Sequence, residues 1–224
     1  MFNTFIFAML IASFILLTIT RLAAKKLIRH HHAQKVDLFR HYPIQAGDIV
    51  FLGDSLTDGA RWDEMFPGAP VKNRGINADI IAGLYDRLGD VTIGHPHAIF
   101  FLIGTNDLSW YEYRSDEEIL AYYDQILQKC RTEIPDTRVY VQSILPRHFS
   151  YSRRIQRLNI KLKALTEEMG YTYIHLFPAF ADSKGGLRRE ITNDNIHLLG
   201  PGYLIWRDLL CPFIDECIQA GTNK

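Results

Sequence analysis

The most constraining feature of this sequence is the alternation of short apolar runs with longer amphipathic segments. The apolar runs have the length of buried strands and are bounded by turn-forming residues; they cover residues 49–52, 98–103, 138–145 and 171–176, and a weaker, more polar strand candidate covers residues 71–76. Helical patterns occupy the intervals, at residues 79–88, 115–130, 151–169 and 202–220. Strands that alternate with helices pair in parallel, and the helices cover both faces of the sheet. The sequence therefore predicts one three-layer α/β/α sandwich with a five-stranded, mainly parallel sheet.

Length and composition limit the classes of protein that the chain can represent. It has 224 residues, of which 47% are hydrophobic, and this is enough for one domain with a substantial core. Three cysteines cannot all pair with one another, so a small disulfide-stabilised scaffold is excluded. Lys+Arg and Asp+Glu number 25 each, which gives a net charge of zero. We therefore expect no nucleic-acid partner, because such proteins present a strongly basic surface.

The N-terminal segment differs from the rest of the chain in its charge. Residues 1–20 carry no charged side chain, whereas residues 21–41 hold six Lys or Arg and a single acid. A helix of this apolar length spans about 30 Å, the thickness of the hydrocarbon core of a bilayer. We therefore predict a single-pass membrane anchor over residues 1–22, a basic juxtamembrane neck over residues 23–41 and a globular domain over residues 42–224.

Two other interpretations of this segment stay open. A cleaved signal peptide normally has a basic residue before its apolar stretch, but here the basic residues follow it, and Ala23-Ala24 is only a weak cleavage site. A buried core helix is the third interpretation. Positive charges after the span favour a cytoplasmic domain, whereas cleavage would lead to export. The side of the membrane on which the domain lies is therefore left open.

Three consecutive histidines, His30, His31 and His32, raise the question of a metal site. Consecutive residues on a helix point about 100° apart, so these three side chains cannot converge on one ion. We interpret them as a titratable extension of the basic segment, and we expect no metal ligands in this chain.

Polar clusters follow the predicted strands. Three of them stand at the carboxyl ends of the first three predicted strands, at residues 53–59, 73–76 and 104–107, and a fourth, at residues 194–197, precedes the last helix. In a parallel sheet the carboxyl ends of the strands share one edge, and ligands bind in the crevice beyond that edge. We therefore expect the four clusters to form one site.

Three residues of these clusters have the chemistry of nucleophilic catalysis. Ser55 directly follows a strand, so its hydroxyl should be exposed at the start of a helix. A serine hydroxyl is a weak nucleophile until a base removes its proton, and a third group must orient the base. Asp194 and His197 lie three residues apart, a spacing that lets the carboxylate hold one imidazole nitrogen while the other faces the serine.

Further residues could stabilise the negative charge that develops during such a reaction. The backbone N–H groups of Ser55 and Gly75 and the side-chain amide of Asn106 are the predicted donors of an oxyanion hole. Asp54 and Asp107 are predicted to support the nucleophile and the Asn106 loop, respectively. Each residue alone also has a purely structural explanation, such as a helix cap or a turn glycine.

Taken together, the four clusters resemble the conserved blocks of the GDSL/SGNH hydrolase family. These blocks supply serine, glycine, asparagine and histidine, and they correspond here to Ser55, Gly75, Asn106 and His197, with Asp194 as the third member of the triad. The resemblance extends over roughly residues 36–219. One departure is Asn195, which stands where many relatives have glycine; it leaves the triad intact but could alter the loop.

The resemblance implies a flavodoxin-like SGNH hydrolase fold and an enzyme without metal or organic cofactor. Within the family, the sequence is most similar to acetylhydrolases and sugar O-acetylesterases related to the catalytic subunits of platelet-activating-factor acetylhydrolase. The implied activity is hydrolysis of a small acyl ester, with acetyl favoured, of a carbohydrate or lipid-like alcohol. An O-acyltransferase and an inactive glycan-binding module are the alternatives. The acyl chain length, the alcohol and the oligomeric state stay open.

Overall fold

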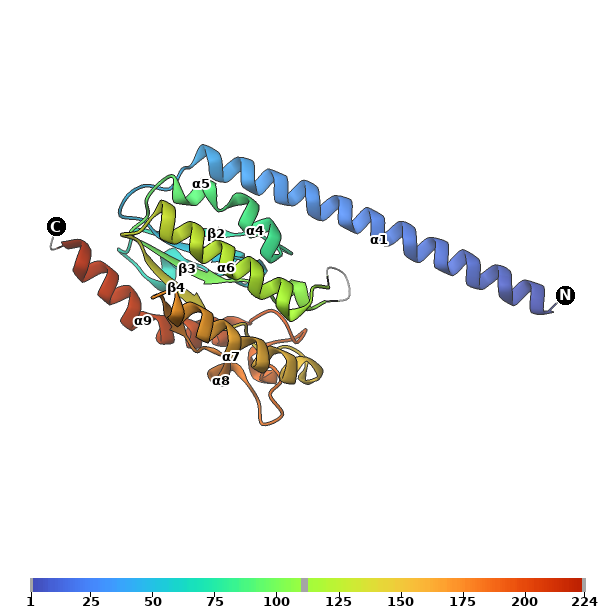
Figure 1. Cartoon of the computed structure of the whole chain (residues 1–224). Helices are drawn as coiled ribbons and strands as arrows, with labels where there is room; N and C mark the ends of the chain where they lie inside the picture. The colour runs from blue at the N-terminus through green and yellow to red at the C-terminus, as the bar shows by residue number, and fades with distance from the viewer. Residues whose placement is uncertain (1, 110–112, 223–224) are drawn as a thin grey trace.

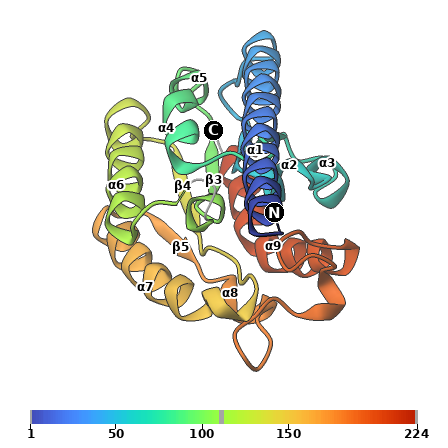
Figure 2. The ribbon, with the colours of Figure 1, turned by 90° about the vertical axis from the view of Figure 1, so that its right-hand side faces the viewer.

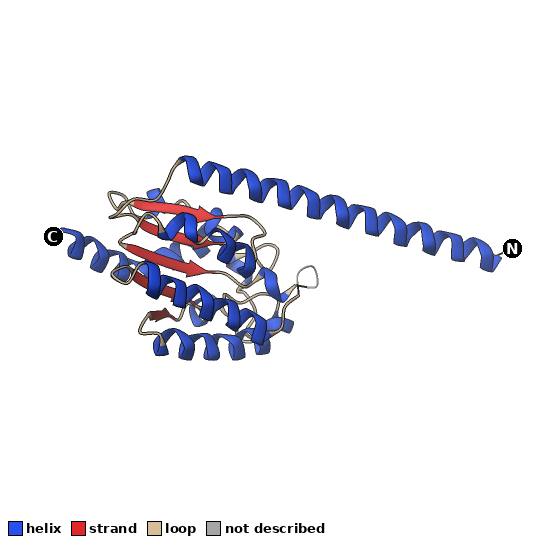
Figure 3. Ribbon diagram, turned by 45° about the horizontal axis from the view of Figure 1, so that its top comes forward, coloured by secondary structure: helices blue, strands red, loops and turns tan. Residues whose placement is uncertain are grey.

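Five parallel strands form a single sheet in the computed structural model of the chain, which describes residues 2–109 and 113–222, without the side chains of residues 2–5, 8 and 220–222. The strand order is β2-β1-β3-β4-β5, and every pair of neighbours is parallel (Figure 3). The strands are β1 (Ile49–Gly53), β2 (Val71–Gly75), β3 (Ala98–Leu102), β4 (Arg138–Gln142) and β5 (Thr172–Ile174). All five predicted strands are confirmed, and the fourth and fifth are each three residues shorter than expected.

The three strands that carry the predicted site end at the same level. In the register of the sheet, Gly53 of β1 lies opposite Gly75 of β2 on one side and Leu102 of β3 on the other. The polar segments that follow these strands therefore start side by side. This shared level brings residues from distant parts of the sequence to one edge of the sheet.

Helices cover both faces of the sheet, which confirms the predicted three-layer arrangement (Figure 2). Side chains alternate along each strand: in β1, Val50 and Leu52 face one core, and Ile49 and Phe51 face the other. The first core is closed mainly by α4 (Ile81–Arg87), α6 (Asp116–Glu133) and α7 (Ser152–Glu168), and the second mainly by α2 (Ser55–Asp58), α3 (Trp62–Met65), α8 (Phe177–Phe180) and α9 (Gly200–Thr222). The helix α5 (Gly89–Thr92) lies between α4 and β3 in the chain.

Local sequence signals fix the ends of the longer helices. α6 begins with a capping box, in which the Ser115 hydroxyl accepts the N–H of Glu118 and the Glu118 carboxylate accepts the N–H of Ser115. Gly170 follows α7 with a φ of 80°, a left-handed conformation that glycine adopts without strain. Both ends agree with the boundaries expected from the sequence.

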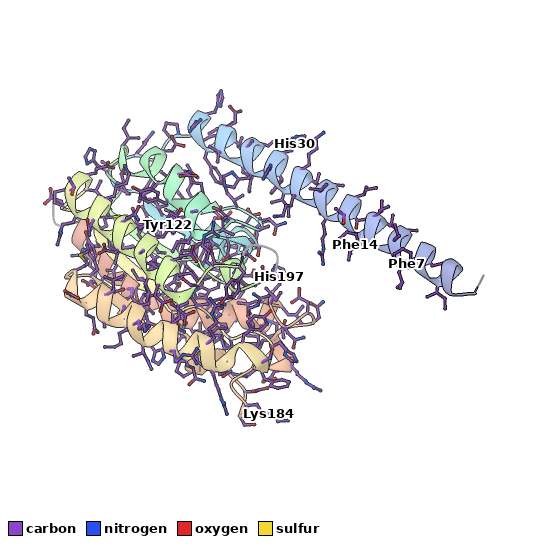
Figure 4. All side chains as sticks on the ribbon, turned by 45° about the vertical axis from the view of Figure 1, so that its right-hand side comes forward. Phe7, Phe14, His30, Tyr122, Lys184 and His197 are labelled. Atoms are coloured by element: carbon purple, nitrogen blue, oxygen red, sulfur yellow. The ribbon has the colours of Figure 1, made fainter. Side chains whose placement is uncertain are left out.

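The N-terminal helix α1 (Phe2–His41) packs on the domain through its C-terminal half. Ion pairs join it to the domain, among them Lys35 with Asp58 at 2.6 Å, His32 with Asp79 at 3.2 Å and Arg40 with Asp90 at 2.9 Å. Its N-terminal half projects beyond the domain, from the end at which the strands terminate (Figures 1 and 3). Phe7 and Phe14 lie on this projecting part and are 65% and 70% exposed (Figure 4).

The membrane anchor predicted over residues 1–22 is not supported by this structure. Across residues 2–109 and 113–222, no helix is both long enough and apolar enough to span a bilayer. Part of the predicted segment lies outside the described residues, namely Met1 and the side chains of residues 2–5 and 8. In the described part, α1 continues without a break from the apolar residues into the basic ones, and the basic part is packed on the domain.

Candidate active site

A tight turn at the end of β1 presents Ser55 at the first position of α2. Asp54 is the N-cap, and its Oδ1 accepts the N–H of Leu56 at 3.0 Å. Gly53 is required before it, because a Cβ at this position would lie 2.2 Å from the carbonyl oxygen of Leu102 and 2.4 Å from Oγ1 of Thr57. The strand, the glycine and the cap together direct the start of α2, so Ser55 lies at the carboxyl edge of the sheet.

The structure brings Ser55, His197 and Asp194 into one hydrogen-bonded chain. The Ser55 Oγ lies 2.9 Å from Nε2 of His197, and Nδ1 of the same ring lies 2.6 Å from Oδ2 of Asp194. Ser55 and His197 are 142 positions apart in the sequence. Figure 4 labels His197 at the edge of the domain. Both imidazole nitrogens are therefore engaged, one with a hydroxyl and the other with a carboxylate.

The second oxygen of Asp194 holds the loop that carries His197. Its Oδ1 accepts the backbone N–H groups of Ile196 at 2.9 Å and of His197 at 2.8 Å. Burial raises the pKa of Asp194, but the hydrogen bonds from the His197 ring and from the two backbone N–H groups outweigh this effect and lower the pKa to about 2. The carboxylate is therefore ionised at any pH near neutrality.

Asn195, the departure from the family pattern, occupies a left-handed backbone conformation. Its φ is 63°, which is uncommon for residues other than glycine but is tolerated by asparagine better than by most. Its N–H donates to Oγ1 of Thr192 at 3.1 Å. The substitution thus preserves the turn between Asp194 and His197.

The three predicted oxyanion donors do not all have a free N–H. The side-chain amide of Asn106 donates one hydrogen to the carbonyl oxygen of Asp79 at 2.8 Å, which leaves its second hydrogen. The backbone N–H of Ser55, at the first turn of α2, has no acceptor among the described residues. Both groups can still serve an oxyanion.

Gly75 has a different role from the predicted one. Its N–H already donates to Oδ1 of Asn73 at 2.8 Å. A Cβ at Gly75 would lie 2.1 Å from the backbone nitrogen of Asp58, so the residue allows β2 to pack closely against α2. The prediction of Gly75 as an oxyanion donor is corrected accordingly, because its N–H is engaged within the protein.

Ala78, which the sequence analysis missed, offers an N–H in the same loop. Within the described part of the chain this N–H has no acceptor, and the next residue, Asp79, receives the Asn106 amide on its carbonyl oxygen. Ala78 has a φ of 60°, an unfavourable conformation for alanine that often marks functional loops. The sequence carries no signal for this conformation, since alanine is not a residue that favours it.

Buried acids lie beneath the site, where the sequence predicted supporting roles. Asp107 is fully buried; its Oδ2 accepts the N–H of Ile81 at 3.1 Å and its Oδ1 pairs with Arg114 at 2.8 Å. It thereby links the Asn106 segment to the start of α4. Burial raises the pKa of Asp107 to about 6, although the Ile81 N–H and Arg114 act in the opposite direction.

Asp54 is buried more completely than its role as a cap requires. Burial raises its pKa to about 7; the Leu56 N–H lowers the pKa, and the nearby charges of Asp79 and Asp107 raise it further. Its Oδ2 has no hydrogen-bond partner among the described residues. A proton on this oxygen at neutral pH would avoid an uncompensated buried charge.

This burial predicts a measurable dependence of stability on pH. In the unfolded chain Asp54 ionises near pH 4, whereas in the folded chain it stays protonated up to about pH 7. The unfolded state therefore gains stability over this interval, and the free energy of unfolding falls. Asp54→Asn keeps the Oδ1 cap and removes the ionisation. Urea denaturation should show the variant gaining stability relative to the wild type between pH 4 and 7; a constant difference across that interval would contradict the prediction.

Comparison with known sequences identifies the class of this protein. The sequence model of the GDSL-like lipase/acylhydrolase family matches residues 51–205, which extend from β1 into α9 and include Ser55 and His197. The protein is a carboxylic ester hydrolase. More particularly, the chain belongs to the GDSL-like lipase/acylhydrolase family, because the match covers more than half of it. No curated protein sequence matches the chain significantly.

Solved structures share the fold at low sequence identity. A Streptococcus pneumonia protein described in terms of platelet activating factor is 24% identical, with a TM-score of 0.80 over 88% of this chain and 99% of that one. A GDSL-like lipase from Bacteroides thetaiotaomicron is 20% identical, with a TM-score of 0.70 over 84% and 97% of the two chains. The acetylxylan esterase Axe2 from Geobacillus stearothermophilus is 19% identical, with a TM-score of 0.63 over 77% and 96%.

Proposed function

We propose that this protein hydrolyses esters through a Ser55–His197–Asp194 triad. The observation that carries the proposal is the unbroken hydrogen-bonded chain from Oγ of Ser55, through both nitrogens of His197, to Oδ2 of Asp194. A neutral imidazole can accept the hydroxyl proton only at a nitrogen that carries none. The ionised Asp194 carboxylate can only accept a hydrogen bond, so the ring proton is on Nδ1. Nε2 then carries no proton and can act as the base toward Ser55.

The reaction then follows in two steps. His197 Nε2 takes the proton of Ser55 while Oγ attacks the ester carbonyl; the tetrahedral intermediate collapses, and the same proton passes to the departing alcohol. In the second step water attacks the acyl-serine, again giving its proton to His197, and the carboxylic acid leaves as Ser55 recovers its proton. No cofactor enters either step.

We propose that the N–H groups of Ser55 and Ala78 and the Asn106 amide hold the oxyanion. Each is free to donate, as described above, and Asn106 lies against the Asp79 carbonyl next to Ala78. A preorganised donor of this kind is worth about 3–4 kcal/mol in the transition state. Ala78 takes the place first assigned to Gly75.

For the substrate, we propose a small acyl group, with acetyl favoured, on a carbohydrate or lipid-like alcohol. The support is twofold. An acetylxylan esterase is among the proteins with the same fold, and the side chains of His197 and Asp194 are 47% and 45% exposed, so the triad is open to a bulky alcohol.

A panel of esters tests this proposal. We expect kcat/KM to fall at least about tenfold from p-nitrophenyl acetate to the octanoate, because a small acyl pocket excludes added methylenes, and we expect acetate release from acetylated xylo-oligosaccharides. The readouts are p-nitrophenol absorbance and acetate in solution. A preference for octanoate would overturn the assignment to a small acyl group, and a folded protein that cleaves none of these esters would overturn the triad mechanism.

A further inference from the structure

Arg87, the last residue of α4, is a buried arginine whose guanidinium makes three hydrogen bonds at the edge of the sheet. Only 4% of the residue is exposed. Its Nε donates to Oδ2 of Asp79 at 2.9 Å, one terminal nitrogen donates to the carbonyl oxygen of Arg74 at 2.8 Å, and the other donates to the carbonyl oxygen of Gly53 at 3.0 Å. All three nitrogens of the guanidinium are used.

The three acceptors belong to the segments that carry the proposed catalytic groups. Gly53 is the last residue of β1, two positions before Ser55, and Arg74 lies near the end of β2, four positions before Ala78. Asp79 directly follows Ala78. The carbonyl oxygen of Gly53 also accepts the N–H of Ile76 at 3.0 Å, which joins the same two segments a second time.

Asp79 connects this arrangement to the remaining donor. Its carbonyl oxygen accepts the Asn106 amide at 2.8 Å, so the residue that Arg87 holds is also the one that orients Asn106. The Asp79 carboxylate is 1% exposed and accepts the N–H of Ile80 at 3.0 Å, and it lies 3.2 Å from Nε2 of His32. Arg87 is thus hydrogen-bonded directly to the segments that carry Ser55 and Ala78, and it is linked to Asn106 through Asp79.

We propose that Arg87 is a positioning residue that holds the Ser55, Ala78 and Asn106 donors at fixed separations. The inference rests on the proposed function, since it concerns the same oxyanion hole. The rigid, planar guanidinium of arginine suits this task because its three nitrogens can bridge two strand ends and a loop. The ammonium of lysine, in contrast, is a single charged group on a flexible side chain. Misplacement of such donors by about 1 Å can lower a rate by about 100-fold.

The competing explanation is that Arg87 only neutralises the buried carboxylate of Asp79. A buried acid without its partner is strongly destabilising, so loss of activity in a single Arg87 variant would not separate the two roles. A comparison of two proteins that both lack the Asp79 charge, with and without Arg87, does separate them. In an Asp79→Asn background the charge has gone, while the bonds from Arg87 to the carbonyl oxygens of Gly53 and Arg74 can still form.

The experiment compares five proteins: the wild type, Asp79→Asn, Asp79→Asn/Arg87→Met, Arg87→Lys and Leu84→Ala. Leu84 is a fully buried residue of α4 without a polar contact to the site, so its truncation controls for a general loss of stability. For each protein we would measure the melting temperature, kcat and KM with p-nitrophenyl acetate, and the rate of inactivation by a serine-reactive phosphonate.

We expect kcat in the double variant to be about 10- to 100-fold below that of Asp79→Asn, with KM changed less than threefold. Phosphonate inactivation should slow in parallel, because it also develops charge in the oxyanion hole. Arg87→Lys should keep most of the wild-type melting temperature but lose kcat. Leu84→Ala should have a lower melting temperature but an unchanged kcat when it is assayed well below that temperature.

Two outcomes would overturn the inference. One is an equal kcat in Asp79→Asn and in the double variant. The other is a loss of kcat in Leu84→Ala as large as that in the double variant, when each is assayed at the same number of degrees below its own melting temperature. The proposed function is judged separately, on the wild type alone. A wild-type protein that neither cleaves the acetate ester nor reacts with the phosphonate would refute the function before any Arg87 variant is considered.

Discussion

Ser55→Ala is expected to lower kcat for p-nitrophenyl acetate by about 10⁴- to 10⁶-fold, the range found when the nucleophile of a serine triad is removed. The variant lacks the hydroxyl that attacks the carbonyl in the proposed mechanism, and His197 has no proton to accept at 2.9 Å. The N–H of residue 55 and the Asn106 amide remain, so KM should change little. The measurement is the initial rate of p-nitrophenol release at saturating ester.

The same variant provides its own structural control. Ser55 is only partly buried and its side chain is small, so the circular dichroism spectrum and melting temperature should match the wild type. A phosphonate should add its mass to the wild-type protein and not to the variant. Undiminished ester cleavage by folded Ser55→Ala would mean that another group is the nucleophile.

Asp194→Asn is expected to reduce kcat by about 10³- to 10⁴-fold through the wrong imidazole tautomer. The N–H groups of Ile196 and His197 bind Oδ1 at 2.9 and 2.8 Å, so they will hold the amide oxygen there. The amide NH₂ must then face Nδ1 of His197. Because two donors cannot face each other, Nδ1 becomes the acceptor and Nε2 carries the proton, which leaves Ser55 without a base.

Asp208→Asn is the matched control for this change. Asp208 is an exposed acid on α9 whose ion-pair partner, Arg207, is the preceding residue, so the same loss of one negative charge should leave kcat within about twofold. The tautomer itself can be read from the ¹⁵N shifts of the His197 ring. If Asp194→Asn retained wild-type kcat, or if Nε2 stayed unprotonated in it, the proposed role of the carboxylate would be wrong.

Much of the fold was predictable because periodicity and composition agree along the domain. The five predicted segments contain the five strands. β1 and β3 are buried on both faces and are apolar along almost their whole length, whereas β2 is largely polar and only partly buried. Ser55 could be proposed because polar residues that follow parallel strands meet at one edge of the sheet. Asp194 and His197 follow no predicted strand; they could be proposed from their three-residue spacing and from the resemblance to the family.

The oxyanion loop was predicted less well because its geometry depends on contacts that sequence patterns do not encode. Gly75 looked like an exposed N–H, yet it is a close-packing residue whose N–H is held by Asn73 two positions earlier. Ala78 takes a left-handed conformation that its residue type does not suggest. The importance of Arg87 was also hidden, because a charged residue at the end of an amphipathic helix usually faces solvent.

The exposure of His197 and Asp194 has a consequence for the fate of an acyl group on Ser55. Enzymes that hand an acyl group to a second alcohol must keep solvent away during the lifetime of the covalent intermediate. Here nearly half of the side-chain surface of His197 and of Asp194 is exposed to solvent, so water would hydrolyse the acyl-enzyme soon after it forms. Synthesis of a new ester would require an acceptor alcohol that excludes water from His197 and Asp194 when it binds. The open geometry therefore favours hydrolysis of the ester.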